Sequence, residues 1–114
     1  MGDELVSQWV DVVAKLTALT QQGKLLWTAT MTPGKGGASF IAKYKDKTLR
    51  LSRVHITELL SFGENRETTR LEFIDNLGNG LWSFPDTANL DDLFNAAKFQ
   101  AAGVQSFLTD ILKE

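Results

Sequence analysis

The sequence has no cysteine, one histidine and only two prolines among its 114 residues. Without thiols the chain can form neither a disulfide nor a zinc site with sulfur ligands. The single histidine, His55, excludes a metal site built from several imidazoles, and we expect it on a strand surface. No apolar run approaches the ~20 residues of a membrane span. The acidic start also differs from the basic start of a secretory signal, so we expect a soluble, cytoplasmic protein.

What the chain does contain is typical of a globular domain. Hydrophobic residues make up 43% of it, aromatic residues 10%, and the net charge is only −2. A chain of this length buries roughly two-thirds of its unfolded surface when it folds. We therefore expect residues 1–114 to form one domain around one core.

The N-terminal segment has the pattern of an amphipathic helix. Apolar residues from Leu5 to Leu19 recur every three or four positions. Asp3 is placed to cap the start, and Gly23 is placed to take a left-handed conformation after the last turn. The sequence predicts one helix with a broad buried face.

After Gly23 the hydrophobic period changes to two, which indicates strands. Three strands are expected at 25–31, 40–44 and 49–52. In the turn between the second and third of these strands, one register pairs residues whose numbers add up to 91. In that register Phe40 lies opposite Leu51 and Ala42 opposite Leu49. A register two residues longer keeps the same faces, so the pattern predicts the faces rather than the pairs.

The later strands are marked less clearly. The apolar phase changes after Ser52, which suggests a bulge at Ser52 and Arg53. Residues 57–63 fit either a longer strand or a helical turn, and 63–69 look like a polar loop. A fourth strand is expected around 71–74 and a fifth over 81–84, joined by a glycine-rich turn.

The C-terminal third is predicted to be helical. Asn89 is a candidate cap, and an apolar stripe with four-three spacing continues through Gly103. The pattern fits one long helix weakened at Gly103, or two helices that are kinked there and share the stripe. The fold class is therefore α+β: an N-terminal helix, an antiparallel meander of four to five strands, and C-terminal helix, with the helices packed on one sheet face. The stripe consists of Leu90, Phe94, Ala97, Ala101, Val104, Leu108 and Ile111.

Two loops resemble known ligand sites in part. The stretch 32–39, TPGKGGAS, lacks the residue order of a phosphate-binding loop and is followed by a strand pattern, so we expect a hairpin loop. The stretch 75–86 matches an EF-hand at four positions, but Leu77 occupies a position that must supply oxygen. We therefore expect no metal and no cofactor. The missing catalytic patterns also lead us to expect that the chain is not an enzyme.

The charge distribution is uneven. Positions 34–54 carry six basic residues and one acidic residue, a local charge of +5 in a chain of −2. Lys43, Lys45, Arg50 and Arg53 are therefore candidate partner-binding residues. The simplest alternative is a solvated sheet face that protects an edge strand. Nucleic-acid binding is a weaker alternative, because Phe40 and Tyr44 share the apolar face and the chain as a whole is acidic.

The two helices have wide apolar faces, and together with many aromatic residues they exceed what one small sheet can hide. We therefore expect a protein partner or a second copy, most simply a homodimer. The main hypothesis is a non-catalytic protein–protein interaction module of adaptor, chaperone-like or immunity type. The alternative is a small-ligand pocket between sheet and helices, lined by Trp27, Trp82 and Phe84.

One short pattern resembles other proteins. Thr20-x-x-Gly23-x-Leu25-x-Trp27 resembles the passage from helix to meander in short bacterial proteins of unknown function, and it implies no activity. Dimeric secretion chaperones are also small acidic α+β proteins. Those chaperones have a helix in the middle of the sheet, and residues 57–63 are too short to form it. The interpretation as a secretion chaperone therefore remains a second choice.

Overall fold

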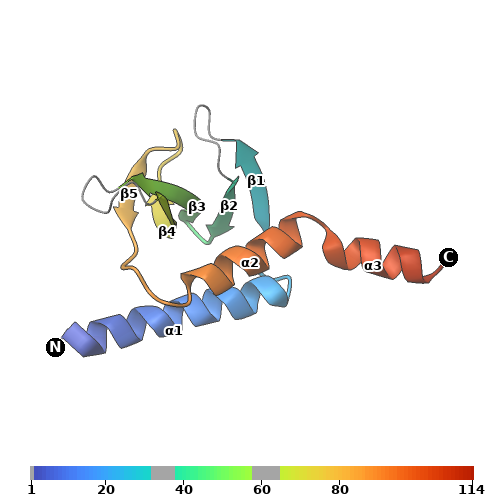
Figure 1. The fold of residues 1–114 in the computed structure, drawn as a ribbon, viewed down its shortest axis with the longest axis horizontal. Coiled ribbons are helices and arrows are strands. Elements are labelled where there is room, and N and C mark those ends of the chain that lie inside the picture. Colours follow the sequence, from blue (N-terminus) through green and yellow to red (C-terminus); the bar gives the residue numbers. More distant parts are fainter. Residues whose placement is uncertain (1, 32–37, 58–64) are drawn as a thin grey trace.

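A computed structural model describes residues 2–31, 38–57 and 65–114. The chain forms a helix, five strands and two further helices (Figure 1). In order these are α1 (Gly2–Gln21), β1 (Trp27–Met31), β2 (Ala38–Tyr44), β3 (Lys47–Thr57), β4 (Asn65–Ile74), β5 (Gly80–Ser83), α2 (Leu90–Ala101) and α3 (Val104–Leu112). The predicted α+β class with its antiparallel meander is confirmed.

The sheet is antiparallel throughout, and its strands lie in the order β1-β2-β3-β4-β5. In the β2–β3 hairpin Phe40 pairs with Leu51 and Ala42 with Leu49, so the shorter of the two predicted registers is the one that forms. These four residues are 5% exposed or less. Because successive strand residues alternate in direction, Lys43 and Arg50 lie on the opposite face.

The predicted bulge at Ser52 and Arg53 is wrong. The β3–β4 register is continuous from Thr48↔Ile74 to Thr57↔Asn65, and the irregularity in the sheet lies instead at Phe73 and Ile74, opposite β5. Arg53 therefore stays on the helix-covered face, and its guanidinium carbon lies 4.8 Å from the centre of the Phe94 ring. At this inner-face position of β3 the alternation of residues predicts an apolar side chain, and the long amphipathic side chain of Arg53 takes its place.

The polar stretch 63–69 is also not simply a loop, because β4 begins at Asn65. Thr69 is buried, and its hydroxyl donates a 2.5 Å hydrogen bond to Asp91 Oδ1. A polar residue is stable at this strand position because α2 supplies its partner. Residues 58–64 and 32–37 lie outside the described part of the chain. Residues 32–37 come between β1 and β2, which pair antiparallel, as expected for a hairpin.

Helices α1 and α2 occupy one side of the sheet. Helix α2 contacts β1 and β4, and α1 lies alongside α2 (Figure 1). Burying apolar surface in this layer is the main force that holds the fold together. The buried core consists of Val13, Leu16, Leu25, Trp27, Phe40, Ala42, Leu49, Leu51, Leu71, Phe84, Leu90, Leu93, Phe94 and Ala97.

The helix ends differ in part from the predictions. Gly23 is left-handed with φ of 74°, as predicted, and the amides of Lys24 and Leu25 return to the carbonyl of Leu19. Helix α1 begins at Gly2, so Asp3 lies within it rather than before it. Asn89 precedes α2 but its side chain makes no cap; its amide nitrogen donates instead to the carbonyl of Val10, 3.0 Å away. The expected cap residue thus joins the two helices.

Helix α3 departs from the rest of the molecule (Figure 1). Gly103 is left-handed with φ of 69°, which ends α2 and turns the chain. The radius of gyration is 15.7 Å, above the ~13 Å of a compact chain of this length. Of the two predicted arrangements, two separate helices are therefore the one that forms.

Candidate functional site

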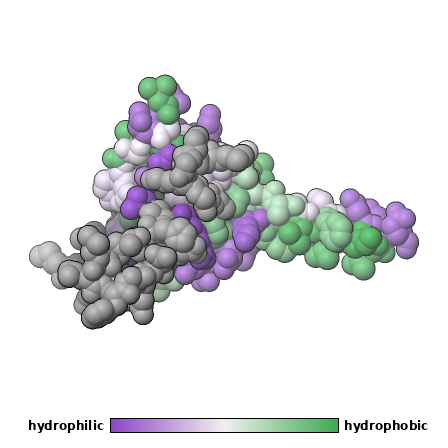
Figure 2. Space-filling view, turned by 45° about the horizontal axis from the view of Figure 1, so that its top comes forward, coloured by the Kyte–Doolittle hydropathy of each residue, from purple (hydrophilic) through white to green (hydrophobic). Residues whose placement is uncertain are grey.

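Helix α3 presents an apolar stripe to solvent. None of its residues is buried, and all of them belong to the described part of the chain. Val104, Phe107, Leu108 and Ile111 follow the spacing of one helix face, and Leu112 widens it. Phe107 is 64% exposed and Leu112 is 83% exposed. Figure 2 shows hydrophobic surface along this helix, with hydrophilic residues on another side.

The predicted stripe shared by α2 and α3 does not form a shared buried face. The stripe residues of α2 up to Ala97 are buried, whereas Leu108 and Ile111 in α3 are 42% and 52% exposed. A left-handed residue at Gly103 changes the direction of the chain, so the hydrophobic phase continues in sequence but not in space. The apolar stripe was predicted correctly from the sequence, but the prediction that its α3 part shares one face with its α2 part is wrong.

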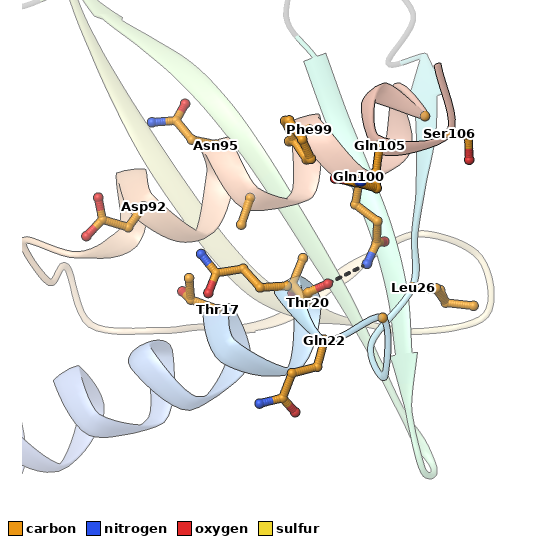
Figure 3. A pocket seen from close by; sticks show the side chains of 14 residues that line it. Thr17, Thr20, Gln22, Leu26, Asp92, Asn95, Phe99, Gln100, Gln105 and Ser106 are labelled. Atoms are coloured by element: carbon orange, nitrogen blue, oxygen red, sulfur yellow. Dashed lines mark hydrogen bonds between the residues drawn. The ribbon is translucent and has the colours of Figure 1, made fainter. Parts of the chain in front are cut away.

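A groove lies between α1 and α2 beside the start of α3, with a volume of about 880 Å³ (Figure 3). From α2 it is lined by Asp92, Asn95, Ala96 and Phe99, which follow the spacing of one helix face. This face is opposite the one that buries Leu93 and the other core residues of α2. Gln100 of α2 also lines it, and from the other parts of the chain it is lined by Thr17, Thr20, Gln21, Gln22, Gly23, Leu26, Gly103, Gln105 and Ser106.

A buried hydrogen-bond network fixes the end of this groove. The indole Nε1 of Trp27 donates to Thr20 Oγ1 over 2.9 Å, and the Thr20 hydroxyl donates to the carbonyl of Leu16. The side-chain amide of Gln100 donates to the carbonyls of Thr20 and Leu25 at 2.9 and 2.7 Å and accepts from the backbone amide of Trp27 at 2.8 Å. Three elements are thus locked together, which gives the Thr20 to Trp27 pattern a structural role.

The groove and the apolar stripe are both nearly uncharged. Asp92 is the only charged side chain among the described residues that line the groove, and Asp110 is the only one in α3. The groove combines exposed apolar groups, Phe99 at 47% and Leu26 at 68%, with a rim of neutral amides. Such a surface suits a neutral amphipathic segment better than a phosphate or a charged peptide.

The four basic residues predicted to bind a partner do not share one surface. Lys43 is exposed on the outer sheet face, and Lys45 lies in the β2–β3 turn with Nζ 5.6 Å from the centre of the Tyr44 ring. Arg50 also belongs to the outer face, but Arg53 lies on the inner face, 3.8 Å from Asp91 Oδ1. These four residues are therefore divided between the β2–β3 turn and the two faces of the sheet.

Arg50 is held by its neighbours. Its Nε donates to Glu72 Oε1 at 2.8 Å, its Nη2 lies 2.7 Å from the same oxygen, and its Nη1 donates to the carbonyl of Gly78 at 2.8 Å. A Cβ at Gly80 would lie 2.7 Å from Glu72 Oε2, so this glycine lets β5 pass over the buried carboxylate. The arrangement ties the β4–β5 turn to β3.

Of the three aromatic residues predicted to line a pocket, Trp82 and Phe84 lie together and Trp27 lies apart. Trp82 and Phe84 belong to a cluster with Trp9, whose ring centre lies 5.2 Å from that of Trp82 and 5.0 Å from that of Phe84. Trp27 is on β1, at the other edge of the sheet from β5, and is 5% exposed. Phe73 completes the cluster, which joins α1 to β4 and β5.

The stretch that resembles an EF-hand, residues 75–86, contains the β4–β5 turn, strand β5 and the three residues after it. Asp75 Oδ1 accepts from the backbone amides of Asn79 and Leu77 at 2.8 and 2.9 Å. The hydrogen bond from the backbone amide of Asn79 is the main reason that the pKa of Asp75 lies below its ordinary value of 3.8.

Within residues 2–31, 38–57 and 65–114 no group of three or more potential metal ligands comes together. No helix in these ranges is long and apolar enough to cross a membrane.

Sequence reasoning missed the groove residues Phe99, Leu26 and Gln100. One signal was available, because Phe99 falls outside the stripe that runs from Leu90 to Ala101 and so gives α2 an apolar residue on its other side. The hydrogen bonds of Gln100 join segments 73 or more positions apart, and no sequence pattern indicates them.

Comparisons with protein-family models, curated proteins and solved structures found no match to this chain.

Proposed function

We propose that this chain is a non-catalytic protein–protein interaction module and that α3 is its contact element. The observation that carries this proposal is the apolar stripe of α3, which none of the described residues buries. A nine-residue helix is shorter than the ~12–15 residues at which an isolated helix becomes even marginally stable in water. Cover from a partner stabilises such a helix by burying its apolar face.

The chemistry of the stripe supports a protein partner. Phe107 and Ile111 lie one turn apart on the same helix face and are both more than half exposed. Exposed, contiguous apolar residues of this kind mark interaction surfaces, and short amphipathic helices bind by placing such anchors in an apolar groove. The scattered positions of Lys43, Arg50 and Arg53 give less support to an interface based on charge.

Site-specific photo-cross-linking tests this proposal. A benzophenone amino acid at position 107 should give a cross-linked product in cells of the natural host, either with a second copy or with another protein. The same group at Tyr44, which is 45% exposed but lies outside the stripe and the groove, is the matched control. Equal yields from the two positions, or no product at position 107, would show that α3 is not a contact element.

A further inference from the structure

We infer that the partner of α3 is a second copy of this chain, and that each copy places its α3 in the α1–α2 groove of the other. This inference rests on the proposed function, because it names the occupant of the same contact element. Its basis is that one chain carries both an uncovered apolar helix and an unfilled groove between two helices.

The groove has the geometry of a third-helix site. Two helices packed side by side leave a furrow between them, and a third helix can place its side-chain ridge in that furrow. Along α2 the lining residues run from Asp92 to Phe99, a rise of ~10 Å, and the lining continues past Gly103. Helix α3 has nine residues, a length of ~14 Å. The length of the helix therefore suits the length of the groove.

A copy does not fill its own groove with its own stripe. Gln105 and Ser106, which lie on the polar side of α3, line the groove, and the stripe of Phe107, Leu108 and Ile111 lies on another side of the helix. The turn at Gly103 sets this direction. The stripe is thus available to the groove of a neighbouring copy, with Phe99 and Leu26 as its apolar contacts.

Area favours a second copy, and the low charge of both surfaces allows it. The groove and α3 carry one acidic residue each, Asp92 and Asp110, so their contact meets little charge repulsion. Scaled by side-chain size, the exposed stripe offers on the order of 500 Å² and Phe99 with Leu26 about 250 Å² more. Stripe against stripe would bury too little, whereas reciprocal exchange buries both surfaces in each copy and approaches the ~800 Å² per partner of a standard interface.

Reciprocal exchange also gives a closed dimer. Each copy donates one helix and accepts one helix, so the two joints are equivalent and no binding surface is left over. This closure distinguishes the arrangement from a head-to-tail chain, in which free helices and grooves would remain at the ends.

A complementation experiment tests the exchange. The stripe variant Phe107→Ser/Ile111→Ser and the groove variant Phe99→Ser each remove one side of the joint. Light scattering should give a dimer of the 12.6 kDa chain for the wild type. For each variant alone the dissociation constant should rise at least about 30-fold. Two controls, Tyr44→Ser and Thr109→Ala/Lys113→Ala, should dimerise as the wild type does.

The decisive sample mixes the two variants. The stripe variant keeps an intact groove and the groove variant keeps an intact stripe, so exchange predicts that the mixed pair associates more tightly than either variant alone, because one of its two joints is intact. A mixture that associates no more tightly than the two separate variants, although the wild type dimerises, would overturn the exchange. The far-UV spectrum and unfolding midpoint of each variant, measured as monomer, show that it is folded, since these side chains lie outside the core.

The outcomes separate this inference from the proposed function. A monomeric wild type, together with a cross-link from position 107 to a different protein, would overturn the second-copy inference and leave the interaction module standing. No cross-link from position 107 would remove both. A heterodimer in the mixture, with matching cross-links between copies, would support both.

Discussion

Helices α2 and α3 follow one another with only Ala102 and Gly103 between them, and both carry a regular apolar stripe. In α2 that stripe is the centre of the core: Leu93 is fully buried and Phe94 packs edge-on against Phe40, 5.5 Å between ring centres. In α3 none of the residues is buried. Hydrophobic periodicity therefore identifies the face of a helix that needs cover, but the element that covers it is set by the direction of the chain.

The largest effect should come from the matched pair Phe94→Ala and Phe107→Ala. Removing the buried Phe94 ring leaves a cavity against Phe40 and Arg53 and should lower the free energy of unfolding by about 3–5 kcal/mol. Removing the exposed ring of Phe107 from the monomer should change it by less than about 0.5 kcal/mol. Urea unfolding at concentrations below the dimer dissociation constant measures both. Similar losses would mean that α3 is packed into the same core.

The next effect concerns the junction that holds α2 against α1 and β1. Gln100→Ala removes three hydrogen bonds and leaves the backbone amide of Trp27 and two carbonyls without those partners. We expect a loss of about 2–3 kcal/mol in the free energy of unfolding. Asn95→Ala, an exposed position on the same helix, should cost less than about 0.5 kcal/mol. A mild Gln100 effect would indicate that water replaces the network.

Gly103 gives a smaller effect, on the turn that separates the two helices. A Cβ here would meet no atom within 4 Å, so the cost of Gly103→Ala is that of a left-handed conformation alone. We expect the free energy of unfolding to fall by about 1 kcal/mol. Gly103→Asn should lose less, because asparagine tolerates this conformation better. If alanine instead stabilises the chain and raises its helix content by circular dichroism, the two helices have merged.

The smallest effect should be the pH dependence at Asp75. The hydrogen bonds from Asn79 and Leu77 hold its pKa below 3.8 in the folded chain. A carboxyl whose folded pKa is lowered adds stability above the unfolded pKa and loses it as the pH falls through the folded pKa. The difference in melting temperature between wild type and Asp75→Ala should therefore shrink as the pH falls below about 4. A carboxyl NMR titration of Asp75 with a midpoint above 3.8 would contradict this account.

Local patterns were enough to predict the helices, the strand order and the faces of the β2–β3 hairpin, although they left two registers open. Phe40, Ala42, Leu49 and Leu51 alternate strictly, and only one choice of faces buries them all. The turn at Gly23 was also predictable, because a glycine directly follows the last helical turn. In these places the local signal and the tertiary structure agree.

The failures occur where a distant residue decides the outcome. Arg53 stays on the inner face because the Phe94 ring lies beneath it, and Thr69 is buried because Asp91 accepts a hydrogen bond from its hydroxyl. The side chain of Asn89 does not cap α2 but binds the carbonyl of Val10 in α1. Each of these partners is distant in sequence: Phe94 from Arg53, Asp91 from Thr69, and Val10 from Asn89. The groove escaped prediction for the same reason, since it exists only between two helices that are far apart in the chain.

Amide hydrogen exchange of α3 at two protein concentrations tests the central claim most directly. Protection at residues 107–112 should be close to that of a free peptide in the dilute monomer and should rise as the concentration passes the dimer dissociation constant, while α2 stays protected throughout. Protection of α3 that is absent at every concentration, or already as strong as that of α2 in the dilute monomer, would contradict the claim that a second copy covers this helix.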